Sequence, residues 1–548
     1  MRVCSVSDDQ PHLSASFGHG VSACGRQMRL IVRSNTYTLI CRPRLCGSGR
    51  RREGWGIQGW EAVAGEGKVG DMGPGAVLGR EEWGYRAESV GEEVESMEGK
   101  NGGRGVRRAA LHNLGCKVNF YETEAMRELL EGHGYEIVSF EEVADVYLIN
   151  TCSVTNMADR KSRQMLHRAK KRNPDAVVIA AGCYVQAAGE ELLKDGAVDV
   201  LIGNNEKERL VEILESFWEE PVHVHDLTHE KRYEELKITQ TSEHTRAYVK
   251  IQDGCDQFCS YCLIPYTRGR VRSRRLSDIL EEVGRLSEHG YQEVVLTGIH
   301  LDSYGVDLGD GEDLLKVVQE IDRVEGIRRI RLGSLEPRIM TEGFVKELSK
   351  VKKLCPHFHL SLQSGCDETL KRMNRKYTTQ DFRECCERLR RYFQEPALTT
   401  DVIVGFPGES QEEFLQTEAF LREIQFYETH VFKFSRRKGT RADRMEGQIP
   451  EEEKTRRSER LLLLTKENSQ RYRKRLIGTV AEVLMEEACQ VDGVCYQVGH
   501  TREYVRVALP TKISLSNHLM RVKVERMLDA DTLCGSLEKA DLEKAALK

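Results

Sequence analysis

The 548-residue sequence lacks the features that mark several large classes of protein. It has no run of about 18 apolar residues, which a membrane-spanning helix would need. Its 82 basic and 87 acidic residues leave a formal net charge of -5, which excludes a globally basic nucleic-acid binder but not a local basic face. Hydrophobic residues make up 39% of the chain, so it is neither collagen-like nor wholly disordered. The length predicts three or four globular domains.

Cysteine is the residue type that the sequence has in unusual number, with 17 copies. A secreted disulfide scaffold would be short and loop-rich, and no apolar signal segment with a small-residue cleavage site opens the chain. In a reducing compartment, grouped thiols are metal ligands or catalysts, whereas scattered ones are buried small hydrophobes. The grouping of the cysteines therefore indicates the chemistry.

One group of cysteines is tight in sequence: Cys255-x3-Cys259-x2-Cys262. Three thiolates on one short loop hold three irons of a cubane cluster and leave the fourth iron open. Structural zinc is the alternative, but it needs four protein ligands, and no second C-x2-C or His pair lies nearby. We therefore predict a cluster with one open iron on this loop.

A second group of cysteines is defined by the expected strands. Cys116, Cys152 and Cys183 each end a short apolar run that predicts a strand. Helical-period segments separate these runs, which predicts βαβ units of a doubly wound, flavodoxin-like domain over residues 106–225. The carboxyl ends of its parallel strands meet at one crevice, where such sheets bind ligands. We predict a second open cluster there; three buried core cysteines are the alternative.

Residues 241–475 again alternate between expected strands and helices. Six βα units predict a partial parallel barrel with its chemistry at the carboxyl ends of the strands, and the cysteine loop follows the first of them. The expected strands lie at 248–251, 293–297, 330–334, 358–362, 400–404 and 430–434. A charged helix over 451–475 then leads to four short strands within 476–540. These predict a small antiparallel β-barrel, a fold that often binds oligonucleotides.

Residues 1–105 differ in composition from the rest. Residues 1–52 are rich in Arg and Ser with only two acids, and 53–105 hold 15 of the 47 glycines. Such a stretch buries too little apolar surface to offset its ordering entropy, so we expect a disordered or non-native extension. An organelle transit peptide over 1–52 is the alternative. The expected location is the cytoplasm, or an organelle if that peptide is real.

These motifs resemble a known family. Cys255-x3-Cys259-x2-Cys262, with Tyr261 before the third cysteine, is similar to the radical S-adenosylmethionine (SAM) signature, and the layout of residues 107–537 resembles the methylthiotransferases. Leu114-Gly-Cys-Lys-Val-Asn119 resembles the MtaB-type branch, which modifies threonylcarbamoyladenosine in tRNA; the isopentenyladenosine branch typically has Gln-Met-Asn after the cysteine and the ribosomal-protein branch Pro-Lys-Asn. Further matching stretches are 149–155, 158–162, 182–184, 298–300, 405–408 and 499–501. Residues 434–437 depart from the Pro-Tyr-Ser frequent in the family, so no substrate contact is placed there.

The resemblance implies an enzyme that inserts a methylthio group at C2 of threonylcarbamoyladenosine next to the anticodon. It implies two [4Fe-4S] clusters and SAM as cofactors: one SAM methylates a sulfur on the Cys116/Cys152/Cys183 cluster, and a second yields the 5′-deoxyadenosyl radical at the other. It further implies a TRAM RNA-binding domain at the C-terminus. The implied partners are the tRNA anticodon loop and an electron donor such as flavodoxin or ferredoxin; the sulfur donor stays open, and no membrane is involved.

The resemblance also suggests contact residues. We expect Tyr261 to pack on the adenine of SAM, and strand-end residues to contact SAM or substrate, with ordinary packing as the alternative for each. These strand-end residues are Thr297, Gly298, Ser334, Gln363 and Asp401. Two basic runs are expected to meet RNA phosphates, with a solvated face as the alternative. The runs are Arg268, Arg270, Arg272, Arg274 and Arg275, and then Arg436, Arg437 and Lys438.

Two other functions stay open at this point. One is a methylthiotransferase that acts on isopentenyladenosine in tRNA or on a ribosomal protein. The other is a zinc-stabilised RNA-binding protein without catalysis.

Overall fold

The computed structural model describes residues 5–7, 28–33, 36–41, 106–217, 219–241 and 245–538. The chain divides into two compact units, Met1–Glu95 and Ser96–Lys548. In the first unit, three described strands pair antiparallel in the order β1-β3-β2: β1 (Ser5–Ser7), β2 (Met28–Arg33) and β3 (Thr36–Cys41). The remainder of residues 1–105 lies outside the described residues, so the expected extension stays a prediction. The second unit contains the predicted site.

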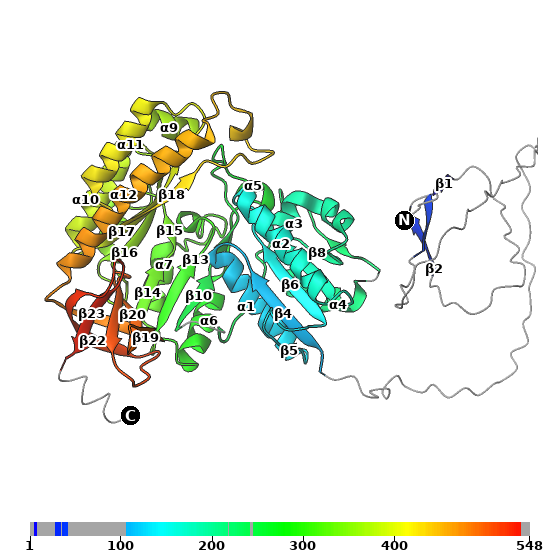
Figure 1. The fold of residues 1–548 in the computed structure, drawn as a ribbon, viewed down its shortest axis with the longest axis horizontal. Helices are drawn as coiled ribbons and strands as arrows, with labels where there is room; N and C mark the ends of the chain where they lie inside the picture. Colours follow the sequence, from blue (N-terminus) through cyan, green and yellow to red (C-terminus); the bar gives the residue numbers. More distant parts are fainter. Residues whose placement is uncertain are drawn as a thin grey trace, which may run out of the picture. The chain divides into compact units, whose positions relative to one another are not determined.

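The second unit begins with a six-stranded parallel sheet in the order β5-β4-β6-β7-β8-β9 (Figure 1). This is the flavodoxin-like strand order with one strand added, as predicted. The strands are β4 (Arg108–Asn113), β5 (Glu136–Ile137), β6 (Val146–Thr151), β7 (Val177–Gly182), β8 (Val200–Ile202) and β9 (Val222–His223).

Helices cover both faces of this sheet because successive strand residues point to opposite sides. On one face, Leu148 and its neighbours pack against α1 (Lys117–Gly132) and α4 (Leu210–Ser216). On the other face, Ile149 and its neighbours pack against α2 (Asn156–Arg172) and α3 (Cys183–Ala188). Strands buried on both faces explain the continuous apolar runs in the sequence.

A curved wall of parallel strands follows, in the order β10-β13-β14 and then β15-β16-β17-β18. Because β14 and β15 are separated only by Gly333, the wall amounts to the six predicted βα units. Its strands are β10 (Arg246–Lys250), β13 (Glu293–Thr297), β14 (Arg329–Leu332), β15 (Ser334–Leu335), β16 (His357–Gln363), β17 (Ala397–Val404) and β18 (Glu428–Lys433). A short antiparallel pair, β11 (Gln252–Asp253) and β12 (Arg272–Ser273), flanks the cysteine loop.

The wall separates an apolar outer side from a polar inner side. In β16, Phe358, Leu360 and Leu362 are buried in the core, whereas the odd-numbered residues between them are only half-buried. The core also takes in residues of the surrounding helices, which are α6 (Leu276–Glu288), α7 (Leu314–Ile321), α8 (Glu342–Leu348), α9 (Asp367–Arg372), α10 (Thr379–Tyr392), α11 (Gln411–Ile424) and α12 (Glu451–Arg475). The odd-numbered positions of β16 therefore face the barrel interior.

The chain ends in a small closed barrel of five strands rather than the four that the sequence predicts. Its order is β19-β20-β21-β23-β22: β19 (Val480–Val491), β20 (Val494–Thr501), β21 (Arg506–Pro510), β22 (Leu519–Met527) and β23 (Leu533–Leu537). The missed strand is β23, which has only five residues with Gly535 at its centre and pairs antiparallel with the preceding β22 and parallel with β21. Within the described part of the chain, no helix has the length and apolar character needed to cross a membrane.

This small barrel packs against the amino ends of the larger barrel's strands. The first residues of β10 and β14 reach it: Arg246 donates to the Tyr504 hydroxyl at 2.9 Å, and Arg329 to the Glu482 carbonyl at 2.7 Å. The Tyr504 ring also stacks on His357, the first residue of β16, at 5.3 Å. The small barrel therefore does not cover the carboxyl ends of the strands, where the cysteine loop begins and where the sequence predicts the active site.

Candidate active site

The cysteine loop 255–262 follows β11 at the carboxyl end of the first barrel strand, as predicted. Gly254 starts it in a left-handed conformation with φ +70°, and a Cβ there would lie 1.7 Å from the Arg270 carbonyl oxygen. A neighbouring turn braces the loop, because the Ser260 amide donates to the Met373 carbonyl and the Asn374 side chain donates to the Phe258 carbonyl, both at 2.9 Å. Backbone geometry thus places this set of cysteines, here called the loop triad.

The donor set around the loop triad fits an iron–sulfur cluster. Each sulfur accepts a hydrogen bond: Cys255 from the Gln257 amide at 3.5 Å, Cys259 from Arg375 at 3.2 Å and Cys262 from the Ile264 amide at 3.4 Å. Such donors stabilise thiolate sulfur and tune the group bound to it. Burial raises the pKa of Cys255 and of Cys262 to about 12, so metal binding at either thiol releases a proton.

The sheet triad, defined as Cys116, Cys152 and Cys183, comes from three strand ends as predicted. Cys116 caps the start of α1, Cys152 follows β6 directly, and Cys183 is the first residue of α3. Burial raises the pKa of Cys116 and of Cys152, and the nearby Cys183 thiol raises both further. Gly115, at φ +119°, passes so close that a Cβ there would lie 2.9 Å from the Cys152 Cβ. These contacts bring the three loops to one point and support the ligand-set prediction over three separate core cysteines.

Asn119 joins two of the loops that hold the sheet triad. Its amide nitrogen donates to the Leu114 and Thr151 carbonyls, both at 2.9 Å, and the Cys116 thiol lies 3.6 Å from its amide oxygen. The Asn150 side chain then donates to the Asn119 carbonyl at 2.9 Å. Asn119 belongs to the Leu114–Asn119 motif, but its positioning role could not be inferred from the sequence alone.

The two triads lie at one interface between the sheet domain and the barrel. Helix α3, which begins with Cys183, packs against α5 (Ile264–Thr267), which follows the loop triad. The Asn204 side chain bridges them, because its nitrogen lies 3.6 Å from the Cys183 sulfur and 2.7 Å from the Thr267 carbonyl oxygen. The thiols of Cys183 and Cys262 are also near enough to interact electrostatically.

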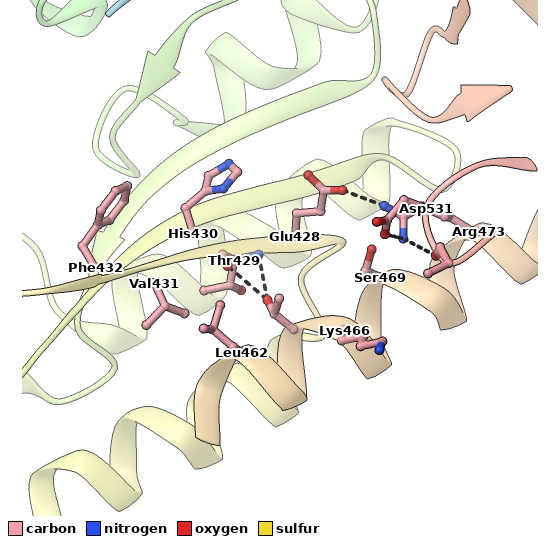
Figure 2. A pocket seen from close by; sticks show the side chains of 12 residues that line it. Glu428, Thr429, His430, Val431, Phe432, Leu462, Lys466, Ser469, Arg473 and Asp531 are labelled. Carbon is pink, nitrogen blue, oxygen red and sulfur yellow. Dashed lines mark hydrogen bonds and ion pairs between the residues drawn. The ribbon is translucent and has the colours of Figure 1, made fainter. Parts of the chain in front are cut away.

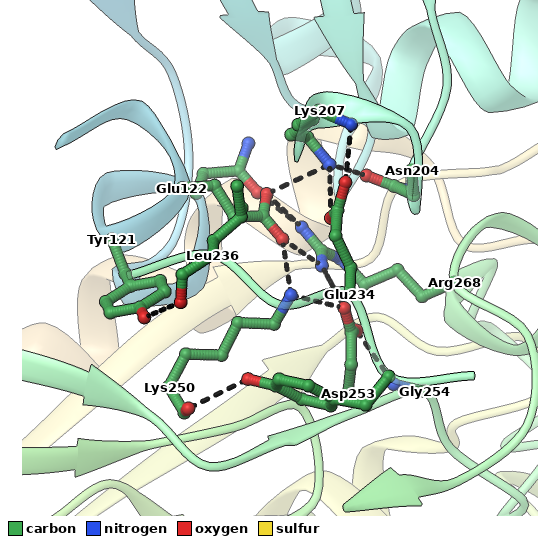
Figure 3. A network of polar contacts seen from close by, with 12 residues as sticks. Tyr121, Glu122, Asn204, Lys207, Glu234, Leu236, Lys250, Asp253, Gly254 and Arg268 are labelled. Atoms are coloured by element: carbon green, nitrogen blue, oxygen red, sulfur yellow. Dashed lines mark hydrogen bonds and ion pairs between the residues drawn. The ribbon is translucent and has the colours of Figure 1, made fainter. Parts of the chain in front are cut away.

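A buried network of charges joins the sheet domain to the barrel (Figure 3). Arg268 donates to Glu122 on α1 at 2.8 Å, to Asp253 at 3.1 Å and to the Asn119 amide oxygen at 2.8 Å. Lys250 reaches the same two carboxylates, at 2.9 and 2.7 Å. Burial alone would raise the pKa of Glu122, but Arg268 and the two lysines beside it hold that pKa well below its usual value. The network therefore stays ionised and links the residues next to Cys116 with those next to Cys255.

The prediction that the basic runs meet RNA phosphates is wrong for four residues. Arg268, Arg272 and Arg274 are buried, and their partners are internal: Arg274, for example, donates to Glu282 at 3.0 Å. Arg437 is buried as well and pairs with Asp159 on α2 at 2.7 Å. These cations neutralise carboxylates from distant parts of the chain, which the sequence alone does not reveal. The exposed members, Arg270, Arg275, Arg436 and Lys438, stay predicted phosphate contacts.

The residues predicted to contact SAM or substrate lie along the barrel strands. Thr297 ends β13 and Gly298 follows it, Ser334 opens β15, Gln363 ends β16 and Asp401 lies within β17. Asp401 accepts an ion-pair contact from His359 at 3.2 Å. Tyr261 packs in an apolar cluster with Phe406, its ring 6.3 Å away edge-to-face, which is the ordinary packing given as its alternative. Contact with SAM stays a prediction for all six.

Arg375 is a candidate site residue that the sequence did not indicate. Its guanidinium lies 3.2 Å from the Cys259 sulfur and 2.6 Å from the Glu336 carboxylate, and His300 lies 3.5 Å from the same carboxylate. A guanidinium fork and a carboxylate beside a cluster cysteine suit a ligand that carries both a carboxylate and an amino group. Arg375 carries no sequence signal, because it reaches the loop only through the fold.

A pocket of about 640 Å³ lies between β18, α12 and residues 530–531 (Figure 2). Thr429 and Val431 point toward α12, and Glu428, His430 and Phe432 lie on the other face of β18. None of the six cysteines or the predicted cofactor residues lines this pocket. It therefore does not include the residues that would hold the clusters.

Comparisons with known proteins agree with this geometry. Residues 108–203 match the model of "Uncharacterized protein family UPF0004", and residues 249–421 match that of the "Radical SAM superfamily". The chain is 40% identical to the threonylcarbamoyladenosine tRNA methylthiotransferase MtaB of Bacillus subtilis over 76% of this chain and 93% of that protein. It is 39% identical to the Aquifex aeolicus protein of the same name, over 69% and 93%.

A relative of another branch is also similar. The tRNA-2-methylthio-N(6)-dimethylallyladenosine synthase of Acetivibrio thermocellus is 34% identical over 76% of this chain and 88% of that protein. These relatives from two branches, the two family matches and the two cysteine triads all support the same conclusion. The chain belongs to the radical SAM methylthiotransferase family, an enzyme family that uses SAM and [4Fe-4S] clusters and whose members reported above modify tRNA.

Proposed function

We propose that this protein inserts a methylthio group at C2 of threonylcarbamoyladenosine next to the anticodon of tRNA. The observation that carries the proposal is the placement of two cysteine triads, each one ligand short of closing a cubane cluster, at one interface. The relatives support this base over dimethylallyladenosine, because the two MtaB proteins are 40% and 39% identical to this chain and the dimethylallyladenosine synthase is 34% identical. We further propose that the sheet domain spans residues 106–225, the radical SAM barrel residues 241–475 and the small barrel residues 476–540.

The protein's part in the reaction is placement. When bound, the clusters and SAM supply the sulfur and the radical chemistry that an unactivated C–H bond requires. Cys255, Cys259 and Cys262 would hold one cluster, and the sheet triad the other. Asn204 and Arg268 hold the two triads in a fixed position relative to each other, because each side chain contacts residues of both the sheet domain and the barrel. The substrate carbon would enter between the two triads.

Aromatic side chains next to the loop triad suit an unpaired base. Tyr266 is 57% exposed, its ring meets that of Phe258 edge-to-face at 5.8 Å, and the Arg270 guanidinium lies over Phe258 at 4.8 Å. Proteins recognise bases in RNA loops by splaying them out and stacking them on aromatic rings or guanidinium planes. We propose this surface as a contact for the anticodon loop, with the small barrel as a TRAM-type RNA-binding domain. The proposed setting is the cytoplasm, with flavodoxin or ferredoxin as electron donor.

Anaerobic reconstitution followed by nucleoside mass spectrometry tests the proposal. The reconstituted protein, given SAM, a reductant and tRNA that carries threonylcarbamoyladenosine, should form the 2-methylthio nucleoside, whereas Cys255→Ala should form none. Parallel reactions contain isopentenyladenosine tRNA or ribosomal protein. If product forms only with isopentenyladenosine tRNA or only with ribosomal protein, that molecule is the substrate instead. A colourless protein that binds zinc and no iron would show that the protein is not a methylthiotransferase.

A further inference from the structure

We propose that Lys117 binds the carboxylate of the threonyl group and thereby selects threonylcarbamoyladenosine. The inference rests on the proposed function and adds a specificity-determining residue to it. The threonylcarbamoyl group carries a carboxylate and a hydroxyl, whereas a dimethylallyl group is a neutral hydrocarbon. A cation at the site therefore distinguishes the two substituents by charge.

Lys117 stands where the modified base has to lie. It follows the sheet-triad ligand Cys116 directly and is the first residue of α1. Helix α1 packs against β10, and the Phe120 ring, one turn further along, meets Tyr248 edge-to-face at 5.3 Å. Tyr248 is only half-buried between the core residues Ala247 and Val249, so it belongs to the inner side of the barrel wall. The start of α1 therefore borders the barrel interior.

Lys117 is a cation without a committed partner. Its side chain is exposed, and among the described residues no hydrogen bond or ion pair engages it. Although solvent reaches it, desolvation by the surrounding protein lowers the pKa of Lys117 to about 8, and Arg331, Arg246 and Asp401 on β14, β10 and β17 lie near enough to shift that pKa as well. Those two arginines are already paired, since Glu293 lies 3.3 Å from Arg246 and 3.0 Å from Arg331. Of these three neighbouring cations, Lys117 alone is available to an incoming carboxylate.

The inner side of the barrel wall carries a polar cluster that fits the hydroxyl and carbamoyl groups of a threonylcarbamoyl substituent. His359, Asp401 and His430 come from three adjacent strands, with His359 3.2 Å from Asp401 and its ring 5.7 Å from that of His430. Their nitrogen and oxygen atoms lie within 4.8 Å of one another. An apolar substituent would desolvate these groups without giving them partners, which is costly. A hydroxyl and a carbamoyl group supply donors and acceptors, and the Asp401 charge steers the carboxylate toward Lys117.

The test compares two anticodon stem-loop RNAs that differ at one group. One carries threonylcarbamoyladenosine, and in the other the carboxylate is replaced by a carboxamide of nearly equal size. Fluorescence anisotropy measures their binding to the reconstituted holoenzyme under anaerobic conditions. A hydrogen bond to a charged group predicts that the wild type binds the carboxylate RNA roughly tenfold to hundredfold more tightly. Lys117→Met should reduce this ratio to about one, and Lys117→Arg should keep most of it.

Lys171→Met is the matched control, because Lys171 is an exposed lysine at the end of α2. It should keep the wild-type ratio. Equal binding of the two RNAs by the wild type overturns the inference without any variant, and so does a ratio that survives in Lys117→Met. If the wild type discriminates but forms no 2-methylthio product on the carboxylate RNA, the proposed function fails instead. Iron content is measured on every variant, and a Lys117→Arg protein with full iron but no discrimination also counts against the inference.

Discussion

The loop triad and the sheet triad reach the same chemical arrangement by different routes. The loop triad takes its three thiols from eight consecutive residues, 255–262, and depends on local turns such as that at Gly254. The sheet triad takes one thiol from each of three strand ends, so it exists only when the parallel sheet is in register. Local spacing identifies the first, and topology is needed to identify the second. The difference predicts that the two sites fail in different ways.

The largest expected effect is loss of one cluster at a time. Cys259→Ala and Cys152→Ala should each lower the iron content of reconstituted protein by about four atoms per chain and leave the other site loaded. Both variants should form no methylthio product. Cys259→Ala should also stop the reductive cleavage of SAM, whereas Cys152→Ala should retain it. Iron analysis and measurement of 5′-deoxyadenosine check this, and loss of both clusters from either single variant would contradict the independence of the triads.

Breaking the network shared by the triads should have the next largest effect. Arg268→Met removes a buried cation that contacts Glu122, Asp253 and Asn119, and leaves mainly lysines to neutralise the two buried carboxylates. We expect it to lower the free energy of unfolding by about 3–5 kcal/mol. Arg270→Met, two residues away, breaks an exposed pair with Asp256 and removes the guanidinium over Phe258, and should cost no more than about 1 kcal/mol. Thermal unfolding compares the two, and equal apparent melting temperatures would show that the network does not stabilise the interface.

Two glycine substitutions should each strain the backbone at one triad and lower the iron content of that triad alone. Gly254→Ala places a methyl group against the Arg270 carbonyl at φ +70° and should empty the loop triad of iron while the sheet triad loads. Gly115→Ala, at φ +119° against Cys152, should do the reverse. Gly284→Ala in α6 is the control, since its added Cβ meets no atom within 4 Å and an alanine favours the helix. Normal iron at both triads in Gly254→Ala would show that the turn adapts.

The sequence predicted what depends on period and spacing. Apolar runs located the strands of the parallel sheets, and three cysteines after three such runs located the sheet triad, because parallel strands end at one edge. It could not predict Arg268 as an internal residue, since Glu122 and Asp253 approach it only in the folded chain. The same holds for Arg375 beside Cys259 and for the parallel pairing of β23 with β21. Long-range pairings of charge or backbone leave no local pattern.

The smallest expected effect is a pH dependence confined to the loop-triad side. Burial, with the Glu336 charge, raises the pKa of Asp302 to about 7 against the attraction of His300, whereas Glu122 behind the sheet triad stays ionised. The ordinary pKa of an aspartate is 3.8, so the folded protein binds this proton more tightly than the unfolded chain does. Its contribution to stability is therefore complete below about pH 4 and is lost as the pH rises through 7.

Between pH 6 and pH 8 that contribution should fall by about 1 kcal/mol in the wild type. Asp302→Asn cannot titrate and should lack this decrease, because its side-chain oxygen still accepts from the Glu336 amide. Asp175→Asn, at an exposed turn, serves as the control and should follow the wild type. Melting temperatures at the two pH values measure the difference. Parallel pH profiles for wild type and Asp302→Asn would mean that the carboxyl is already ionised at pH 6, and that both triads are then flanked by fixed charge.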